Sequence, residues 1–264
     1  MREVTFEESR KIQLDILIYF DEWCKQHGLH YSLGEGTLIG AIRHKGFIPW
    51  DDDIDLLMPR KDYDEFINSY NGKYRLVSLN TEKRWWSCYS RLTDERTLVK
   101  FINPNNNYHG LWISLLPIDN YPDNKKEWIT AKKTMDKYLK LCRMKDVYWV
   151  KGGSVILNVM NYLRKVLLQP LTFNRIGYQC QKLLKSFNNR ETKNKGQMAC
   201  LWHEPWVFDA NLIAGFVDVE FEGRMFPALQ GYDAYLREQY GDYMQLPPED
   251  KRVAKHDYKA YWKD

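Results

Sequence analysis

The sequence has few cysteines and no long apolar run, and both absences narrow the class of protein. No apolar stretch approaches the roughly 20 residues that a membrane-spanning helix needs, and the N-terminus, MREVTFEESRKIQLD, is too charged for a secretory signal. The five cysteines are scattered, odd in number and in no CxxC pair, a pattern typical of reduced thiols in a cytosol. The chain also lacks internal repeats and low-complexity segments. We therefore expect a soluble, cytoplasmic protein.

Aromatic residues, in contrast, are abundant. The 264 residues include 10 Trp and 18 Tyr, and aromatics make up 15% of the chain. The hydrophobic fraction of 44% is ordinary for a globular protein. This length can bury a sizeable core as one domain or as a domain with an insertion. Large aromatic surfaces are thus available for packing or for ligand contact.

Positive charge is concentrated in one block. The net charge is only +4, but residues 131–190 hold 13 Lys+Arg against 2 Asp+Glu, an excess of +11. The rest of the chain holds 26 against 33, a balance of −7. Nucleic-acid binding is disfavoured, because the remainder is acidic and no known nucleic-acid-binding module is present.

A small-residue turn, Gly34-Glu35-Gly36-Thr37, follows a short apolar run and opens a helix-like segment. Glycine allows a ligand to approach the backbone closely. The free N–H groups at a helix start favour an anion such as phosphate. The turn therefore predicts a phosphate contact around Gly36 and Thr37.

An acidic run follows about one helix later. It reads Asp51-Asp52-Asp53-Ile54-Asp55 and leads directly into Leu56, Leu57 and Met58. In an extended strand, alternate residues share a face, so Asp51, Asp53 and Asp55 are predicted to project together. Three like charges raise each other's pKa unless a cation neutralises them. Oxygen ligands of this kind suit Mg²⁺ or Mn²⁺ bound with substrate phosphates. The alternative is an acidic turn that caps a helix or faces water.

Periodicity and turn residues predict the remaining elements. A capping box at Thr5 and Glu8 starts a helix that Gly28 ends. The other predicted helices are 37–44, 60–70, 123–145, 154–168, 171–187 and 230–240. The predicted strands are 31–33, 53–58, 74–79, 86–92, 97–101, 111–116, 197–203 and 217–221, with a polar loop at 188–196.

The amino-acid sequence of the central stretch resembles that of a known family. GTLIGAIRHKGFIPWDDDIDLLMPRKDYDEF is similar to the first block of the LicD family, which includes fukutin-type proteins and belongs to the nucleotidyltransferase superfamily. GLWISLLPID at 110–119 resembles the second block of the family. YGDYM at 240–244 with LPP at 246–248 resembles the C-terminal block.

The resemblance implies an α/β fold. Its nucleotidyltransferase-type core, a mixed sheet with flanking helices, would span 1–122. A basic helical insertion would span 123–190, and 191–264 would return to the core. The basic block then has two readings. It docks on the cytoplasmic leaflet near a lipid-linked acceptor, as a peripheral contact through 131–190, or it is a helical subdomain with its lysines in water.

The resemblance also implies an activity. A bacterial phosphocholine-transferase-like member would use a CDP-activated donor, with CDP-choline the first expectation. It would transfer the phospho-alcohol to a sugar hydroxyl of a surface glycan, either lipopolysaccharide or teichoic acid, and release CMP. One alternative is a nucleotidyltransferase that uses an NTP and releases pyrophosphate. The other is a non-catalytic relative that binds nucleotide or glycan.

By this resemblance, Asp53 and Asp55 would hold one or two Mg²⁺ (or Mn²⁺) ions, with Asp51 as a third ligand or a residue behind them. The residues expected to contact substrate are Gly36, Thr37, Arg43, His44, Arg60, Asp119, Arg252 and His256. Several of these have structural alternatives. Arg43 would pair with an aspartate, His44 would be a hydrogen-bonded structural residue, Arg60 would only brace the acidic strand, and Asp119 would be a structural contact. Arg252 and His256, at i and i+4, would belong to a solvated terminal helix.

One position departs from the family pattern. The second block usually supplies a third metal-binding carboxylate, but here the residue is Ser114, a poor ligand for a hard cation. Either Asp51 substitutes, which we favour, or one metal site is weak, or the enzyme is impaired.

A choline group is usually held by aromatic faces through cation–π contacts. The candidates by composition, each of which also suits a core position, are Trp85, Trp86, Tyr89, Trp112, Tyr148 and Trp149.

Overall fold

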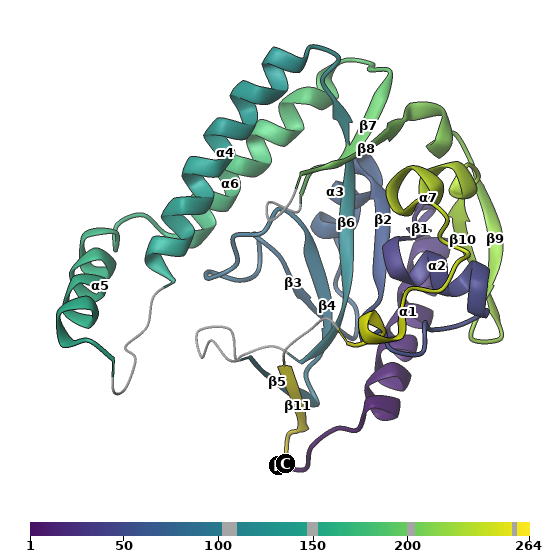
Figure 1. The fold of residues 1–264 in the computed structure, drawn as a ribbon, viewed down its shortest axis with the longest axis horizontal. Helices are drawn as coiled ribbons and strands as arrows, with labels where there is room; N and C mark the ends of the chain where they lie inside the picture. Colours follow the sequence, from purple (N-terminus) through teal and green to yellow (C-terminus); the bar gives the residue numbers. More distant parts are fainter. Residues whose placement is uncertain (102–109, 147–152, 200–203, 255–257) are drawn as a thin grey trace.

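The chain folds around a mixed seven-stranded sheet with helices on its faces (Figure 1). The computed structural model describes residues 1–101, 110–146, 153–199, 204–254 and 258–264, and every structural statement refers to these ranges. The α/β class and the mixed sheet with flanking helices, both predicted from the sequence, are confirmed.

The first helix, α1 (Phe6–His27), follows its predicted boundaries. The Thr5 hydroxyl accepts a hydrogen bond from the Glu8 N–H, and the Glu8 carboxylate accepts one from the Thr5 N–H. Gly28 ends the helix in the left-handed conformation, at φ 65°. Its apolar face, with Ile16, Leu17 and Phe20 fully buried, packs into the main core.

The strand order of the sheet is β1-β2-β6-β4-β3, and β7 and β8 extend it from the far part of β6. Only the β2–β6 pair is parallel among the described pairs. The strands are β1 (Ser32–Leu33), β2 (Asp55–Pro59), β3 (Arg75–Val77), β4 (Ser90–Asp94), β6 (Leu111–Tyr121), β7 (Asn194–Gln197) and β8 (Trp206–Asp209). In β6, every residue from Leu111 to Asn120 is buried, as expected for the middle of a covered sheet.

Two helices connect the first strands. Helix α2 (Glu35–His44) links β1 to β2, and α3 (Arg60–Ser69) starts directly after β2. The predicted order of helix, strand, glycine turn, helix, strand and helix is therefore confirmed. Several boundaries differ from the prediction: β2 begins at Asp55 rather than 53, β4 begins at Ser90 rather than 86, and β6 continues to Tyr121 rather than ending at 116. The predicted strand 197–203 is wrong at 198–199, which follow the end of β7, and 200–203 lie outside the described residues.

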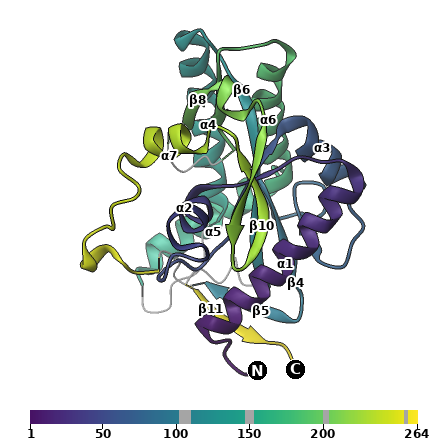
Figure 2. The same ribbon diagram turned by 90° about the vertical axis from the view of Figure 1, so that its right-hand side faces the viewer.

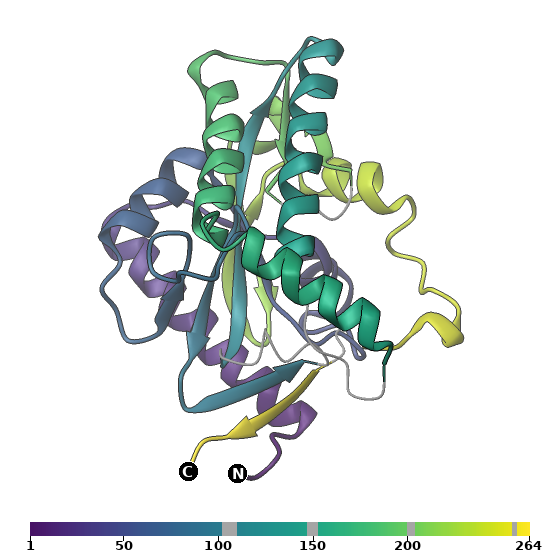
Figure 3. The same ribbon diagram turned by 90° about the vertical axis from the view of Figure 1, so that its left-hand side faces the viewer.

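Two small antiparallel sheets complete the core, and the sequence did not predict one strand of each. β9 (Phe216–Phe221) pairs with β10 (Arg224–Leu229), and β5 (Thr97–Phe101) pairs with β11 (Tyr258–Trp262). The β5–β11 pair brings the C-terminus beside the N-terminus (Figures 2 and 3). Helix α7 (Tyr232–Tyr240) lies between these strands in the chain.

The three remaining helices lie between β6 and β7 in the sequence. They are α4 (Lys125–Lys145), α5 (Val155–Leu167) and α6 (Phe173–Ser186). Helices α4 and α6 run side by side (Figures 1 and 3) and share a small core that includes Trp128, Met135, Leu184 and Cys88. Because β7 starts at Asn194, the predicted loop 188–196 is partly wrong. The domain limits at 122 and 190 stay a prediction.

A buried ion pair fastens α3 to β6. The Arg60 guanidinium donates two hydrogen bonds to the Asp119 carboxylate, each 2.6 Å long. The Arg60 side chain is 7% exposed and that of Asp119 is 0% exposed. Asn188 donates a further 2.6 Å bond to Asp119, so the chain after α6 is held to the same carboxylate. This arrangement favours the bracing role that the sequence left open for both residues.

The pair generates a test of stability. Replacing Arg60 alone by Met leaves a buried carboxylate without its cation, and we expect the free energy of unfolding to fall by about 3–5 kcal/mol. The double variant Arg60→Met/Asp119→Leu should recover most of that loss, because no charge is then left uncompensated. Urea denaturation of the three proteins measures this. Unchanged stability of the single variant would contradict the bracing role.

Candidate functional site

One cavity of about 800 Å³ brings together five of the eleven predicted site residues, Gly36, Arg43, Asp51, Asp53 and Asp55. It is lined by the start of α2, the loop 48–55, the end of α7 and the segment 242–251. Asp51, Asp53 and Asp55 all line it, so the sequence correctly grouped these carboxylates. Contrary to the prediction, the three aspartates do not share one strand, because only Asp55 belongs to β2.

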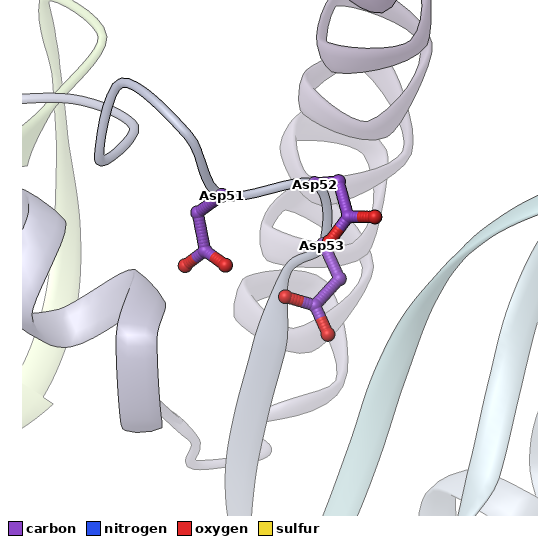
Figure 4. A group of neighbouring side chains, drawn as sticks. All are labelled: Asp51, Asp52 and Asp53. Atoms are coloured by element: carbon purple, nitrogen blue, oxygen red, sulfur yellow. The ribbon is translucent and has the colours of Figure 1, made fainter. Parts of the chain in front are cut away.

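The three aspartates lie where the chain bends from the turn at 48–51 into the strand (Figure 4). One carboxylate oxygen from each of Asp51, Asp52 and Asp53 lies within 4.8 Å of the others. Asp52 is buried and does not line the cavity. Asp51 and Asp53 therefore belong to two acidic groups. One group also contains Asp52, and the other, on the cavity wall, also contains Asp55.

Helix α1 holds the loop 48–55 through the backbone. Arg10 donates hydrogen bonds to the Ile48 carbonyl at 2.5 Å and to the Asp51 carbonyl at 3.0 Å. The buried Gln13 amide donates one to the Asp52 carbonyl at 2.8 Å. The sequence predicted a structural role for α1. These contacts define that role, because through them α1 fixes the path of the acidic loop.

Asp55 is positioned by one residue of helix α2 and one residue of strand β6. Its N–H donates a 3.0 Å hydrogen bond to the Thr37 hydroxyl, and the β2–β6 register places it opposite Ser114. The Ser114 hydroxyl hydrogen-bonds the Asp55 carboxylate. Ser114 thus occupies the place beside Asp55 where the family pattern has a third carboxylate, but it supplies a hydroxyl.

The pKa of Asp55 is raised well above its ordinary value. Burial is the main cause, and the nearby charges of Asp53, Glu35 and Asp51 act in the same direction. Such a cluster favours a bound cation, because the cation offsets the repulsion and allows all the carboxylates to ionise. The donor set of carboxylate oxygens fits Mg²⁺ or Mn²⁺.

Glu35 is a fourth carboxylate that the sequence reading missed. It lines the cavity as the first residue of α2 and has a left-handed φ of 46°, which is uncommon for a residue other than glycine. The buried Gln197 amide donates a hydrogen bond to its carboxylate. In the sequence, Glu35 stands between two glycines and reads as part of a turn, so no local signal marks it.

Gly36 and Thr37 are placed differently from a simple phosphate loop. A Cβ at Gly36 would collide with a carboxylate oxygen of Asp51, so a side chain at this position would force Asp51 to move. The Asp51 carboxylate accordingly lies at the N-terminal turn of α2, where a helix favours negative charge. The Thr37 hydroxyl accepts from Asp55, and Thr37 itself is buried. A phosphate contact at Gly36, which lines the cavity, stays a prediction.

Arg43 joins the two ends of the chain at the cavity. Its guanidinium donates to the Tyr243 carbonyl at 2.6 Å and to the Gln245 carbonyl at 3.2 Å, and to the His44 ring at 2.9 Å. Burial, and then the charge of Arg43, lower the pKa of His44. Arg43 thus holds the 242–251 wall. His44 does not line the cavity, which favours its structural alternative.

Three of the other predicted substrate contacts, Arg60, Asp119 and Arg252, do not line the cavity. Arg60 and Asp119 are committed to their buried pair. The expected helix face shared by Arg252 and His256 is wrong at its first residue: Arg252 follows a single 3₁₀ turn at Glu249–Lys251 and donates to the Pro247 carbonyl at 2.8 Å. His256 lies outside the described residues.

Three of the aromatic candidates, Trp85, Tyr89 and Trp112, surround a cation that belongs to the chain. The Arg91 guanidinium lies 4.1 Å from the ring centre of Trp112, 5.3 Å from that of Trp85 and 5.8 Å from that of Tyr89. These rings therefore hold Arg91, and Tyr148 and Trp149 are not described. The cavity has aromatic residues of its own, Trp50, Trp206, Tyr240 and Tyr243, which the sequence reading missed.

Comparisons with known proteins point to one family. A family model described as LicD/FKTN/FKRP, nucleotidyltransferase domain, matches residues 28–145. The chain is 30% identical over 274 residues to the lipopolysaccharide cholinephosphotransferase LicD of Haemophilus influenzae, and the alignment covers 99% of each chain. An uncharacterized protein of Rickettsia prowazekii is 42% identical over 41 residues, which are 16% of this chain and 15% of that protein.

The raised pKa of Asp55 predicts a pH dependence of stability. In the metal-free protein the folded state holds the Asp55 proton more tightly than the unfolded state does. Stability should therefore fall as pH rises from the ordinary Asp pKa through the raised folded value. Asp55→Asn should remove this loss and be more stable than the wild type at mildly alkaline pH.

Thermal unfolding with a chelator, followed by addition of Mg²⁺, measures this effect. Mg²⁺ should stabilise the wild type more than the Asp55→Asn variant, since the variant lacks one ligand. A variant that is less stable than the chelated wild type across the whole pH range would contradict the assignment.

Proposed function

The chain belongs to the LicD family, and we propose that it transfers phosphocholine from CDP-choline to a sugar hydroxyl of a cell-surface glycan. The whole-length relative in Haemophilus influenzae is a cholinephosphotransferase for lipopolysaccharide, which supports both the transferred group and the acceptor class. The observation that carries the proposal is one cavity in which five carboxylates, those of Glu35, Asp51, Asp53, Asp55 and Asp242, meet several aromatic rings.

We assign the fold of the core to the nucleotidyltransferase type. The support is the order β1, α2, β2, in which a glycine turn opens a helix and a carboxylate begins the next strand. The family model, which carries the same description, begins at residue 28 and spans all three elements.

In this proposal, Asp53 and Asp55 are metal ligands. Asp51 supplies the third carboxylate, because position 114 is a serine in this chain. All three line the cavity. The raised pKa of Asp55 supports a cation here, because a cation would offset the repulsion among these carboxylates. Bound Mg²⁺ supplies positive charge that offsets the charge developing on the transferred phosphoryl group and on the leaving nucleotide.

The proposed reaction is a single displacement at phosphorus. The acceptor hydroxyl oxygen bonds to the phosphorus that carries choline, the bond between the two phosphates breaks, and CMP leaves with the bridging oxygen. The hydroxyl proton passes to a carboxylate of the cavity. Asp51, Asp53, Asp55 and Glu35 would hold the cation, and the charge of the cation would attract the donor's diphosphate, which the carboxylates alone would repel.

Aromatic residues of the cavity can receive the trimethylammonium group. Trp206 and Tyr240 both line it, with ring centres 5.2 Å apart in an edge-to-face arrangement. Quaternary ammonium groups bind at the faces of such rings through cation–π attraction. We therefore assign the choline end of the donor to this side of the cavity, near the end of α7.

A second candidate function is a non-catalytic relative that binds nucleotide or glycan. The observation that favours it is Ser114, which hydrogen-bonds Asp55 where a further metal ligand is expected. Nucleotide binding without metal dependence or turnover would support this candidate.

The assay is CMP release from CDP-choline in the presence of Mg²⁺ and lipopolysaccharide that lacks phosphocholine. Asp53→Asn and Asp55→Asn should each lower the rate by at least about a hundredfold, because the charge that positions the metal and phosphates is lost. Asp52→Asn is the matched control: it removes a carboxylate from the same acidic run, but one that does not line the cavity, and should keep most activity.

Loss of activity in Asp52→Asn but not in Asp55→Asn would move the metal to the group of Asp51, Asp52 and Asp53. Release of pyrophosphate from CTP, without use of CDP-choline, would replace the proposal by nucleotidyl transfer.

A further inference from the structure

Helix α5 presents an apolar face to solvent. Nine of its thirteen residues are exposed large hydrophobic side chains, among them Ile156 at 75%, Leu163 at 54% and Leu167 at 78%. Soluble monomers rarely expose contiguous apolar surface of this kind without a partner. Figures 1 and 3 show α5 at the outer side of the α4–α6 pair, away from the sheet.

The orientation of α5 is the reverse of that of an ordinary surface helix. At about 100° per residue, most of its apolar residues fall within one arc about 140° wide. That arc includes Val159 and Val166, both exposed, whereas the polar Asn158 on the opposite side is buried. A helix that packed on the core would bury the apolar arc and expose the asparagine. The exposed face thus requires an occupant that is apolar.

The surroundings of this face are cationic. Arg164 and Lys165 are exposed on α5, and the Lys145 ammonium donates a 2.7 Å hydrogen bond to the Leu168 carbonyl at the end of the helix. Burial lowers the pKa of Lys145, and the charges of Lys165 and Arg84 lower it further, which places these cations close together. Residues 131–190 carry the excess of +11.

We propose that α5 is a membrane-surface helix whose apolar face inserts into a bilayer that contains anionic lipids. Thirteen residues span about 20 Å as a helix, less than the roughly 30 Å of a bilayer core, so α5 lies along the surface. Nor does any helix in the described parts of the chain have the length and apolarity to cross a membrane.

Charge decides between a lipid surface and a second copy of the chain. An amphipathic helix with basic residues at its polar boundary is attracted to anionic lipid headgroups. Two copies that met through this region would bring the same cations together, which opposes self-association. The inference does not rest on the proposed transfer reaction, because lipid binding is measured without substrate.

The test is co-flotation of the full-length chain with vesicles of phosphatidylcholine alone and with vesicles that also contain phosphatidylglycerol. The wild type should float with the anionic vesicles, and high salt should weaken its binding. Leu163→Ser should reduce partitioning by about tenfold, because it removes one inserted side chain. Met225→Ser is the matched control, since Met225 on β10 is equally exposed at 54%, and should bind like the wild type.

Failure of the wild type to bind anionic vesicles would overturn the proposal, as would equal losses in Leu163→Ser and Met225→Ser. Sedimentation of the lipid-free protein provides the other arm. A dimer that Leu163→Ser dissociates would assign the face to a second copy instead. CMP release measured in parallel, without membranes, separates failure of this proposal from failure of the proposed reaction.

Discussion

Repulsion among carboxylates is the constraint on which the site depends. Asp51, Asp53, Asp55 and Glu35 face one cavity, and burial with mutual repulsion raises the pKa of Asp55. Such a group stays together only if its backbone is fixed by other contacts. Arg10 and Gln13 of α1 hold the carbonyls of the acidic loop, and β6 holds Asp55 through the parallel pairing with β2. Because Gly36 has no side chain, the Asp51 carboxylate occupies the space beside it.

The cavity needs both ends of the chain. Its floor comes from residues 35–55, whereas its far wall comes from 240–251, and Arg43 ties the two through backbone carbonyls of the wall. The helices α4, α5 and α6 contribute no residue to this lining. They are joined to the core through the buried Asp119, which binds both Arg60 and Asn188. This separation lets the helical segment carry a surface role while the site stays intact.

Local signals in the sequence predicted much of the core and a part of the site. The capping box at Thr5, the glycine at 28 and the apolar run after Asp55 act through neighbouring residues, and the elements that they predict are present. The grouping of Asp51, Asp53 and Asp55 was correct, but strand alternation was the wrong reason for two of them. Residues that act over long sequence separations gave no such signal: Glu35 with Gln197, and the strands β8, β10 and β11. Likewise, the aromatic candidates near Trp85 hold Arg91, a pairing that composition alone does not reveal.

The central claim is that metal-bound carboxylates hold a CDP-linked alcohol in this cavity. Calorimetric titration with CDP-choline, CDP-ribitol, CDP-glycerol and CTP, each with and without Mg²⁺, tests it most directly. The account predicts that CDP-choline binds more tightly than CTP and the other CDP-alcohols, and that its binding requires Mg²⁺. Tighter binding of CTP, or CDP-choline binding that is the same with a chelator, would contradict it.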